Sequence, residues 1–273
     1  MRETVGIIAG NGKLPLMVAE GIRRAGHRAI AVGHIGITSK DIKDSVDGLW
    51  WVHIGELGKI IEILKKAQTT GALLVGAVAK TNFFSRTQFF PRVKPDERAI
   101  RVLSRLRNKK DDVLLRAIAE EVESEGIRVL SPVPFLQESM APRGCWTERK
   151  PSEREIKDIA FGWEVGKEIA SLDVGQTIVL KDQMVLAIEG LEGTDAVIRR
   201  GAKLGRGDVM VIKVCKPKQD LRLDLPVIGL STIRTLVKSG ASSMVVEAEK
   251  TIVVDKSSVI READRNHLCL LGM

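Results

Sequence analysis

The feature that most constrains the fold is a strand, a glycine turn and a helix at the start of the chain. Residues 5–9 form a short apolar run with β-branched members, and a Gly-Asn-Gly turn at residues 10–12 interrupts it. Pro15 then opens a helical pattern that ends at Gly26, and proline at the start and glycine after the end are typical of a helix. This opening predicts a strand–turn–helix unit.

Strand and helix patterns continue to alternate through the first half. Strand patterns occur at residues 28–33, 50–54, 73–78 and 127–130, and helical patterns at 57–67, 97–106 and 112–125. Such alternation favours an α/β fold with one parallel sheet and helices on both faces. Residues 133–152 are rich in proline and lack periodicity. We interpret them as a linker between a first domain, residues 1–132, and a second domain, residues 153–273.

The second half has a different pattern. Ser152 and Glu155 have the spacing of a capping box, which predicts a helix up to about residue 171. Paired strand patterns predict two hairpins, at residues 175–189 and 243–254. Because strands dominate and helical crossovers are fewer, we expect a separate α+β domain.

Charge and composition limit the function. The 43 basic and 35 acidic residues give a net charge of +8, which favours an anionic partner: nucleic acid, an anionic lipid surface or a phosphorylated small molecule. Aromatic residues make up only 4% and tyrosine is absent, which argues against single-stranded nucleic acid. The three cysteines show no zinc or disulfide spacing, which fits a reducing cytoplasm. The apolar runs are too short to span a bilayer.

The turn at residues 10–15 is the first candidate binding site. Glycines between a strand and a helix can bring backbone amides close to a phosphate. The dinucleotide fingerprint requires a third glycine, where this chain has Pro15, and an acidic residue after the second strand, where it has Gly33 and His34. We therefore expect no nicotinamide or flavin cofactor. A tight turn without a ligand is the alternative.

A second candidate is the acidic turn at residues 189–195. It holds three carboxylates, two glycines that permit close approach of a ligand or metal, and Thr194, which we expect to cap a helix. The alternative is an elaborate helix cap without a ligand.

The third candidate is the charged stretch from Lys213 to Asp224. It contains four basic and two acidic residues. If the chain is extended there, Asp220, Arg222 and Asp224 share one face. Cations can stabilise the negative charge of a reacting phosphate, and a carboxylate can orient water or hold Mg²⁺. A surface ladder of ion pairs is the alternative.

A phenylalanine-rich loop at residues 81–95 could meet lipid. It contains four phenylalanines with basic residues on or beside it: Lys80, Arg86, Arg92 and Lys94. The loop could contact lipid chains and anionic head groups, or it could fill a core or a dimer contact.

Several of these motifs occur in the same order in a known family. The motifs are residues 7–15, Asp111–Asp112, Gly175–Gln176, residues 189–195 and the pattern at residues 216–229. Together they resemble, over nearly the whole chain, the two-domain, non-calcineurin UDP-2,3-diacylglucosamine pyrophosphatases. One departure is Asn11, where the family usually has glycine, but asparagine tolerates a left-handed backbone.

The resemblance implies a fold and a reaction. The fold would be a Rossmann-like first domain with a parallel sheet and an α+β catalytic second domain. The reaction would hydrolyse UDP-2,3-diacylglucosamine to UMP and 2,3-diacylglucosamine 1-phosphate (lipid X) in lipid A biosynthesis, with Mg²⁺ or another divalent cation. The critical aspartate of the family falls on Asp224, which is also the expected metal ligand.

We expect catalysis from Asp224, Asp220 and Arg222. The expected substrate-binding residues are Gly10, Asn11, Gly12, Leu14, Pro15, Gln176, Glu192, Gly193, Thr194, Asp195, Lys213, Lys216 and Gln219. The expected partners are the UDP-sugar lipid and, transiently, the inner face of the inner membrane, with no nucleic acid; the oligomeric state is open, with a homo-oligomer as one option. The alternative function is a non-catalytic nucleotide-sugar or nucleic-acid-binding protein.

Overall fold

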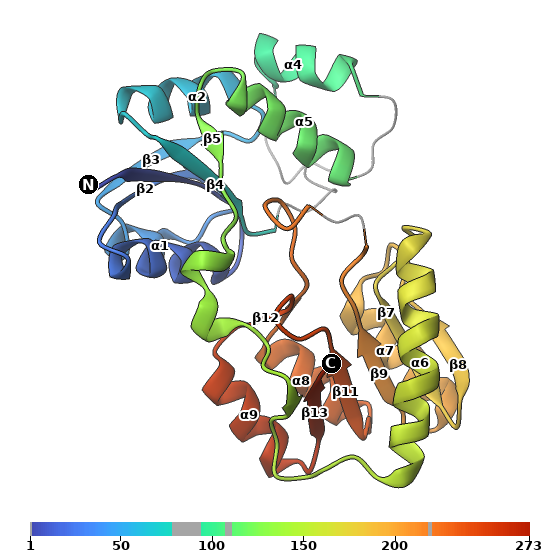
Figure 1. Cartoon of the computed structure of the whole chain (residues 1–273). Coiled ribbons are helices and arrows are strands. Elements are labelled where there is room, and N and C mark those ends of the chain that lie inside the picture. The colour runs from blue at the N-terminus through green and yellow to red at the C-terminus, as the bar shows by residue number, and fades with distance from the viewer. Residues whose placement is uncertain (1, 78–93, 107–110, 218–219) are drawn as a thin grey trace. The chain divides into compact units, whose positions relative to one another are not determined.

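The structure is a computed structural model that describes residues 2–77, 94–106, 111–217 and 220–273 (Figure 1). Most of the phenylalanine-rich loop, residues 81–93, therefore lies outside the described residues. The chain forms two units, each with its own core. Unit 1 comprises residues 1–137 with Asp220–Asp224, and unit 2 comprises residues 138–219 with 225–273.

Unit 1 is built on a parallel five-stranded sheet. Its strands are β1 (Thr4–Ala9), β2 (Arg28–His34), β3 (Gly48–Val52), β4 (Gly71–Val75) and β5 (Arg128–Val129), in the spatial order β3-β2-β1-β4-β5. Every neighbouring pair is parallel, as the sequence predicted. The order reverses between β1 and β4, and in doubly wound sheets ligands bind outside the carboxyl ends of the strands at that point.

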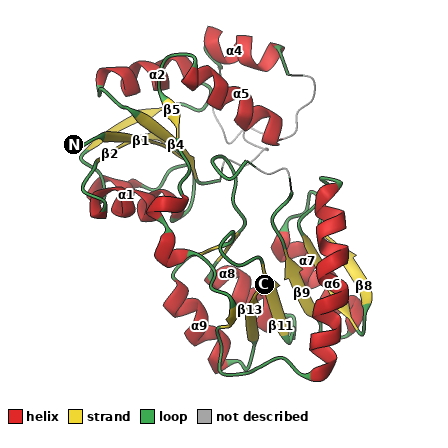
Figure 2. Ribbon diagram, viewed as in Figure 1, coloured by secondary structure: helices red, strands yellow, loops and turns green. Residues whose placement is uncertain are grey.

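Helices cover both faces of this sheet (Figure 2). One face carries α1 (Leu14–Arg24), and the other carries α2 (Leu57–Lys66), α4 (Glu97–Ser104) and α5 (Asp111–Glu123). The second face buries a continuous hydrophobic core that includes Ile61 and Leu64 of α2 and Val122 of α5. Short 3₁₀ helices occur at Lys40–Asp44, Val133–Phe135 and Gln137–Ser139.

Unit 2 is built on a mixed six-stranded sheet. Its strands are β6 (Gly144–Cys145), β7 (Thr177–Lys181), β8 (Met184–Ile188), β9 (Met210–Lys213), β11 (Ser243–Val246) and β13 (Cys269–Gly272), in the order β6-β13-β11-β9-β7-β8. Strands β9, β11 and β13 are parallel, whereas β6, β7 and β8 run antiparallel to their neighbours. The predicted fold class is confirmed: a parallel α/β sheet and a separate mixed sheet.

The helices of unit 2 also lie on both faces of its sheet. Helix α6 (Glu153–Ser171) packs on one face, and α7 (Thr194–Gly205), α8 (Leu230–Lys238) and α9 (Lys256–Arg265) pack on the other. The predicted capping box starts α6: the Ser152 hydroxyl accepts from the Glu155 amide, and the Glu155 carboxylate accepts from the Ser152 amide. This local prediction is confirmed.

One of the two predicted hairpins is present. Strands β7 and β8 pair antiparallel around a turn at Asp182 and Gln183. The prediction of a hairpin at residues 243–254 is wrong, because β11 pairs parallel with β9 and β13, and β12 (Ile252–Val253) pairs parallel with β10 (Val227–Ile228). Two short apolar runs separated by a turn look like a hairpin in sequence, but here each run has a parallel partner distant in the chain.

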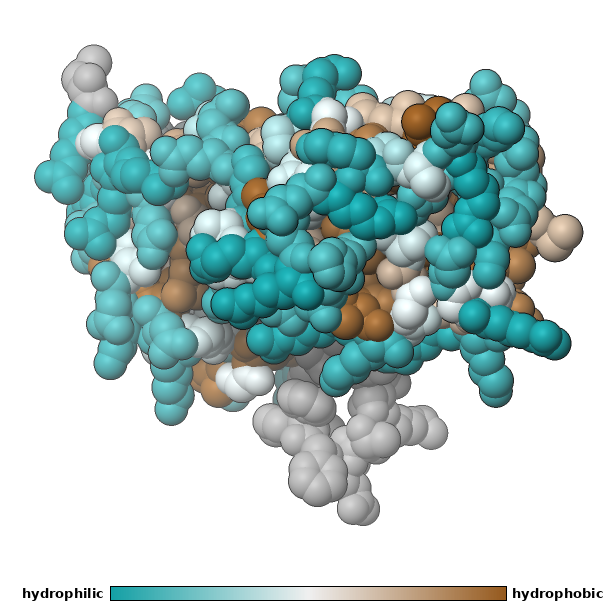
Figure 3. Space-filling model, turned by 90° about the horizontal axis from the view of Figure 1, so that it is seen from below, coloured by the Kyte–Doolittle hydropathy of each residue, from teal (hydrophilic) through white to brown (hydrophobic). Residues whose placement is uncertain are grey.

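The interval at residues 133–152 contains ordered elements. It holds two of the 3₁₀ helices and β6, which pairs with β13 at the edge of the unit 2 sheet. Among the described helices, none combines the length and the apolar character needed to cross a bilayer. On the face shown in Figure 3 hydrophilic side chains predominate, with hydrophobic ones scattered between them.

Candidate functional site

The glycine turn of unit 1 lies at the carboxyl ends of β1 and β4. The Gly10 amide donates to the Val75 carbonyl (2.7 Å), and Asn11 and Ala77 exchange backbone hydrogen bonds of 2.8 and 3.2 Å. A Cβ atom at Gly10 would lie 2.6 Å from the Gly76 carbonyl oxygen, so glycine is required for this approach. The predicted turn therefore lies at the reversal point of the sheet, where a ligand is expected.

The amides of this turn are already bonded within the protein. Gly10 and Asn11 donate to backbone carbonyls, and Gly12 donates to Asn11 Oδ1 (2.8 Å). The left-handed residue is Gly12 (φ 93°), and Asn11 instead contributes its side chain. Helix α1 then begins at Leu14 with no side-chain cap. The glycine amides of this turn are therefore not available to an anion without a change of these hydrogen bonds.

His34 occupies the end of β2, where a dinucleotide site would have an acidic residue. It is buried, and its Nδ1 lies 2.9 Å from the Ala9 carbonyl oxygen, which also accepts from the Thr38 hydroxyl. Burial lowers the pKa of His34, so the ring is neutral at pH 7. The His34 side chain connects β2 to β1 and is not the carboxylate that holds a ribose in dinucleotide sites.

The segment Asp220–Asp224 belongs to unit 1 and forms a turn. The interpretation of an extended segment, in which Asp220, Arg222 and Asp224 share one face, is therefore wrong. The amides of Leu223 and Asp224 both donate to the Asp220 carbonyl, at 2.9 and 3.1 Å. The Arg222 side chain folds back onto the Asp220 carboxylate with Nε–Oδ1 and Nη2–Oδ2 distances of 3.1 and 2.8 Å. This side-chain pairing and the two backbone hydrogen bonds stabilise the turn.

Two further contacts fix this turn on unit 1. Arg222 Nη1 donates to Glu123 Oε1 of α5 at 3.0 Å, and Leu223 packs against the hydrophobic core of the unit. The hydrogen bonds from Arg222 lower the pKa of Asp220, which is therefore ionised at neutral pH. Asp224 is exposed at the end of the turn. The two carboxylates therefore differ in exposure: Asp220 is partly buried, and Asp224 is exposed.

In unit 2 the acidic turn leads to a buried polar chain. Thr194 Oγ1 donates to Glu189 Oε1 (3.0 Å) and accepts from Lys213 Nζ (2.9 Å). Lys213 is only 5% exposed and also donates to the Val227 carbonyl (3.2 Å). The expectation that Thr194 caps α7 is wrong, because Gly193 (φ 81°) is the N-cap residue and no side chain caps the helix. The Thr194 hydroxyl serves Glu189 and Lys213 instead.

The remaining predicted residues of unit 2 lie around this chain or on the surface. Glu192 accepts from Arg200 (2.5 Å) and from the Gly190 amide (3.0 Å), and the Arg200 bond lowers the pKa of Glu192. Gln176 precedes β7, and its buried Oε1 has no hydrogen-bond partner among the described residues. Lys216 pairs with Asp173 at 2.6 Å. Asp195 lies in the first turn of α7, and Gln219 lies outside the described residues.

Each unit therefore assembles part of the predicted set. Unit 2 brings Gln176, the turn at 189–195 and Lys213 to one end of its sheet, since Glu189 pairs with Thr177 and Val214 pairs with Gln176 through the backbone. Unit 1 holds the glycine turn and the Asp220–Asp224 turn. Sequence reasoning missed Glu123 as a partner of Arg222; 99 positions separate the two residues, and no local pattern indicates the contact.

No resident metal cage is evident in the part of the chain that the structure describes. No group of three or more histidine, cysteine, aspartate or glutamate side chains there could hold an ion. Asp220, Glu189 and Glu192 already accept hydrogen bonds from neighbouring residues.

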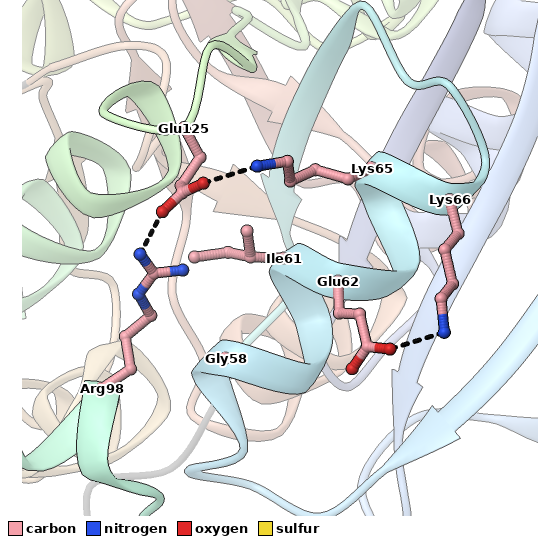
Figure 4. Close-up of a pocket in the computed structure, with 7 residues that line it drawn as sticks. All are labelled: Gly58, Ile61, Glu62, Lys65, Lys66, Arg98 and Glu125. Carbon is pink, nitrogen blue, oxygen red and sulfur yellow. Dashed lines mark hydrogen bonds and ion pairs between the residues drawn. The ribbon is translucent and has the colours of Figure 1, made fainter.

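A surface hollow of about 320 Å³ in unit 1 lies among α2, α4 and the end of α5 (Figure 4). Its charges are paired: Glu125 with Lys65 (2.7 Å) and Arg98, and Glu62 with Lys66 (2.5 Å). These bonds hold the pKa of Glu125 at about 2. None of the predicted site residues lines the hollow. We therefore do not assign the site to it.

Comparison with known proteins matches the two halves of the chain to two domain models of one family. The LpxI N-terminal domain matches residues 4–139, and the LpxI C-terminal domain matches residues 142–271. The chain belongs to the LpxI family. This confirms the family indicated by the sequence motifs.

A curated LpxI relative matches the chain over nearly its full length. It is the UDP-2,3-diacylglucosamine pyrophosphatase LpxI of Caulobacter vibrioides, 35% identical over 280 residues, which cover 98% of this chain and 97% of the relative. The match therefore spans both domains of this chain.

Solved structures give only distant likenesses. The biotin carboxylase domain of a thermophilic 2-oxoglutarate carboxylase is 10% identical with a TM-score of 0.29, over 66% of this chain and 35% of that chain. The biotin carboxylase subunit of pyruvate carboxylase is 9% identical with a TM-score of 0.28, over 70% and 39%. The LpxI chain spans well under half of either structure, and scores of this size carry no argument.

Proposed function

We propose that this LpxI-family chain hydrolyses the pyrophosphate bond of UDP-2,3-diacylglucosamine. The products would be UMP and 2,3-diacylglucosamine 1-phosphate, an intermediate of lipid A biosynthesis. The observation that carries this proposal is the 35% identity to a relative of that name across 98% of the chain. The paired matches to both domains support it, because a shared binding domain alone would match only one half.

Asp224 is the proposed catalytic carboxylate. It is exposed at the end of a turn whose other carboxylate, Asp220, is held by Arg222. Hydrolysis of a diphosphate depends mainly on positioning and electrostatic stabilisation. Asp224 would orient the attacking water or a cation, while Asp220 and Arg222 fix the turn that carries it.

Each unit, taken by itself, carries residues that we propose as substrate contacts. In unit 1, we propose that an anionic group of the substrate binds at the Gly10–Gly12 turn and the first turn of α1, which contains Leu14 and Pro15. In unit 2 Lys213 supplies a buried cation. The other proposed contacts of unit 2 are Gln176, Glu192, Gly193, Thr194, Asp195, Lys216 and Gln219.

We further propose that the reaction requires Mg²⁺ or another divalent cation. Mg²⁺ commonly binds through one or two carboxylates together with substrate phosphates rather than in an all-protein cage. A single exposed carboxylate such as Asp224 fits that mode, and the missing three-ligand cluster among the described residues fits it as well. The cation would neutralise charge on the diphosphate.

The substrate carries two acyl chains, so we propose that the enzyme works in the cytoplasm at the inner face of the inner membrane, bound peripherally. The net charge of +8 supports attraction to an anionic surface.

Substitution of Asp224 tests the proposed function. We expect Asp224→Ala to abolish UMP release from UDP-2,3-diacylglucosamine, with a circular dichroism spectrum and melting temperature like those of the parent, because the side chain is exposed. Asp44→Ala, which alters an exposed aspartate in the 3₁₀ helix Lys40–Asp44, is the matched control and should retain parental activity. Equal UMP release by the Asp224 variant and the parent would remove Asp224 from the mechanism. A parent that binds the UDP-sugar but releases no UMP would favour the non-catalytic alternative.

Chelation tests the cation. We expect EDTA to stop UMP release and excess Mg²⁺ to restore it, because the proposed ion is shared with the substrate and exchanges freely. Steady-state UMP release after dialysis, with and without Mg²⁺, measures this. Full activity in the presence of EDTA would contradict the proposed cation.

A further inference from the structure

Glu189 differs from the other buried acidic residues of the chain. Four acidic side chains are buried among the described residues, and all four lie in unit 2: Glu155, Asp158, Glu189 and Glu247. Three of them accept hydrogen bonds at both carboxylate oxygens. Glu189 accepts at Oε1 from Thr194, whereas its buried Oε2 has no partner within the described part of the chain.

An incompletely paired buried carboxylate is costly for folding. Buried polar groups are nearly always hydrogen-bonded, and exceptions are concentrated where function requires them. Two neighbouring oxygens share this property, Gln176 Oε1 and Thr177 Oγ1, and the Glu189 amide donates to the Thr177 carbonyl (2.9 Å). These three oxygens therefore lie at one end of the unit 2 sheet, where Thr177 pairs with Lys213.

The hydrogen bonds of Thr194 transmit the orientation of Glu189 to Lys213. A threonine hydroxyl has a single hydrogen to donate. Thr194 gives it to Glu189 Oε1, so its lone pairs are left to accept from Lys213 Nζ, 2.9 Å away. A lysine ammonium on a flexible stem takes its position from its acceptors. Glu189 thus orients the Thr194 hydroxyl, which together with the Val227 carbonyl (3.2 Å) holds the Lys213 ammonium.

We propose that Glu189 is a positioning residue for the pyrophosphatase reaction. Acting through Thr194, it holds the Lys213 ammonium in the place from which it attracts the anionic diphosphate of the substrate. This inference rests on the proposed function, in which Thr194 and Lys213 contact substrate. It adds a residue that itself need not touch the substrate.

Kinetics of single and double variants test the coupling. We expect Glu189→Gln, which makes the bond from Thr194 a neutral one, and Thr194→Val, which removes it, each to lower kcat/KM for UMP release by about 10- to 100-fold. Because Glu189 and Thr194 act through the same series of hydrogen bonds, the double variant should have a kcat/KM little lower than that of either single variant. Thr194→Ser, which retains the hydroxyl, should lose much less than Thr194→Val.

A buried acidic residue that takes no part in the Glu189–Thr194–Lys213 hydrogen bonds is the matched control. Asp158→Asn alters a carboxylate that accepts from the Asp182 and Gln183 amides at 3.1 and 2.6 Å, so it should lower the melting temperature and leave kcat/KM unchanged. A Glu189→Gln variant with parental kcat and KM would overturn the proposal. Multiplicative losses in the double variant would overturn it as well.

Lysine labelling tests the same inference without activity. Acetic anhydride should acetylate Lys213 in the parent more slowly than the exposed Lys238. Peptide mass spectrometry measures the extent of acetylation at both lysines. In Glu189→Gln and Thr194→Val the relative rate at Lys213 should rise. An unchanged rate would overturn the positioning role even if the parent released UMP. Conversely, a parent without UMP release would defeat the proposed function, while the labelling result would still decide whether Glu189 positions Lys213.

Discussion

At the scale of single residues, Glu155 shows how sequence and tertiary partners combine. Its bond to the Ser152 amide is a local capping interaction, whereas Arg149 Nη2 (2.9 Å) and Ser242 Oγ (2.8 Å) reach it from outside the helix. Burial by itself would raise the pKa of Glu155. The bonds from Ser152, Arg149 and Ser242 outweigh it and hold the pKa at about 2. The carboxylate is therefore charged and buried, at 1% exposure.

This residue makes stability dependent on pH. Because the folded pKa is lowered from 4.5 to about 2, Glu155 contributes stability that is complete above pH 4.5 and is lost as the pH falls toward 2. The contribution is on the order of 3 kcal/mol. We expect the difference in the free energy of unfolding between the parent and Glu155→Gln, from urea titrations, to be largest near pH 7 and to shrink below pH 4. A difference independent of pH would contradict this assignment.

At the scale of elements, the β7–β8 hairpin is held by a residue of another element. The turn residues Asp182 and Gln183 both have positive φ, 51° and 58°. Two consecutive left-handed residues match the right-handed twist of the strands, but this conformation is unfavourable for residues such as Gln183 that are not glycine, asparagine or aspartate. The Asp158 carboxylate of α6 accepts both turn amides and so offsets the strain.

Replacing a strained turn residue should stabilise this hairpin. We expect Gln183→Gly to raise the free energy of unfolding by about 0.5–1 kcal/mol, because glycine adopts positive φ without a steric penalty. Gln183→Val, a β-branched residue, should lower it. Thermal unfolding of the three proteins measures both effects, and a Gly variant less stable than the parent would show that the Gln183 side chain itself stabilises the turn.

At the scale of the whole molecule, the chain returns to unit 1 from the middle of unit 2. Only residues Asp220–Asp224 do so, and they carry the three proposed catalytic residues. Their attachment depends on Arg222 with Glu123 and on Leu223 in the core of unit 1. The proposed catalytic turn is therefore positioned by the first unit, although its sequence belongs to the second half.

Loosening this attachment should reduce activity more than stability. We expect Glu123→Gln to lower kcat for UMP release by about tenfold or less, because Arg222 loses one of its two carboxylates. The melting temperature should change little, since exposed ion pairs contribute about 0–1 kcal/mol. Glu120→Gln, on an exposed position of the same helix, is the control. Parental kcat in the Glu123 variant would mean that the turn is held without this pair.

The amino-acid sequence by itself determined the features that depend on neighbours in the chain. The periodicity of apolar residues and the positions of glycine, proline and capping residues predicted the parallel sheet, its covering helices, the capping box at Ser152 and the first hairpin. The order of the motifs indicated the family. The assignment of catalytic and substrate-binding residues stays a prediction. Local patterns can settle these features because helices, caps and tight turns form between residues a few positions apart.

Only the tertiary structure decided the partners of distant segments. It gave β11 and β12 parallel partners, directed Thr194 to Glu189 and Lys213 instead of the helix end, and turned Asp220–Asp224 back onto α5. Arg222 and Glu123 are 99 positions apart, and Lys213 and Thr194 are 19 apart. Contacts at such separations form only when complete helices and strands pack together. A polar group buried by that packing must find a hydrogen-bond partner nearby, and the sequence does not show which of several polar residues will be there.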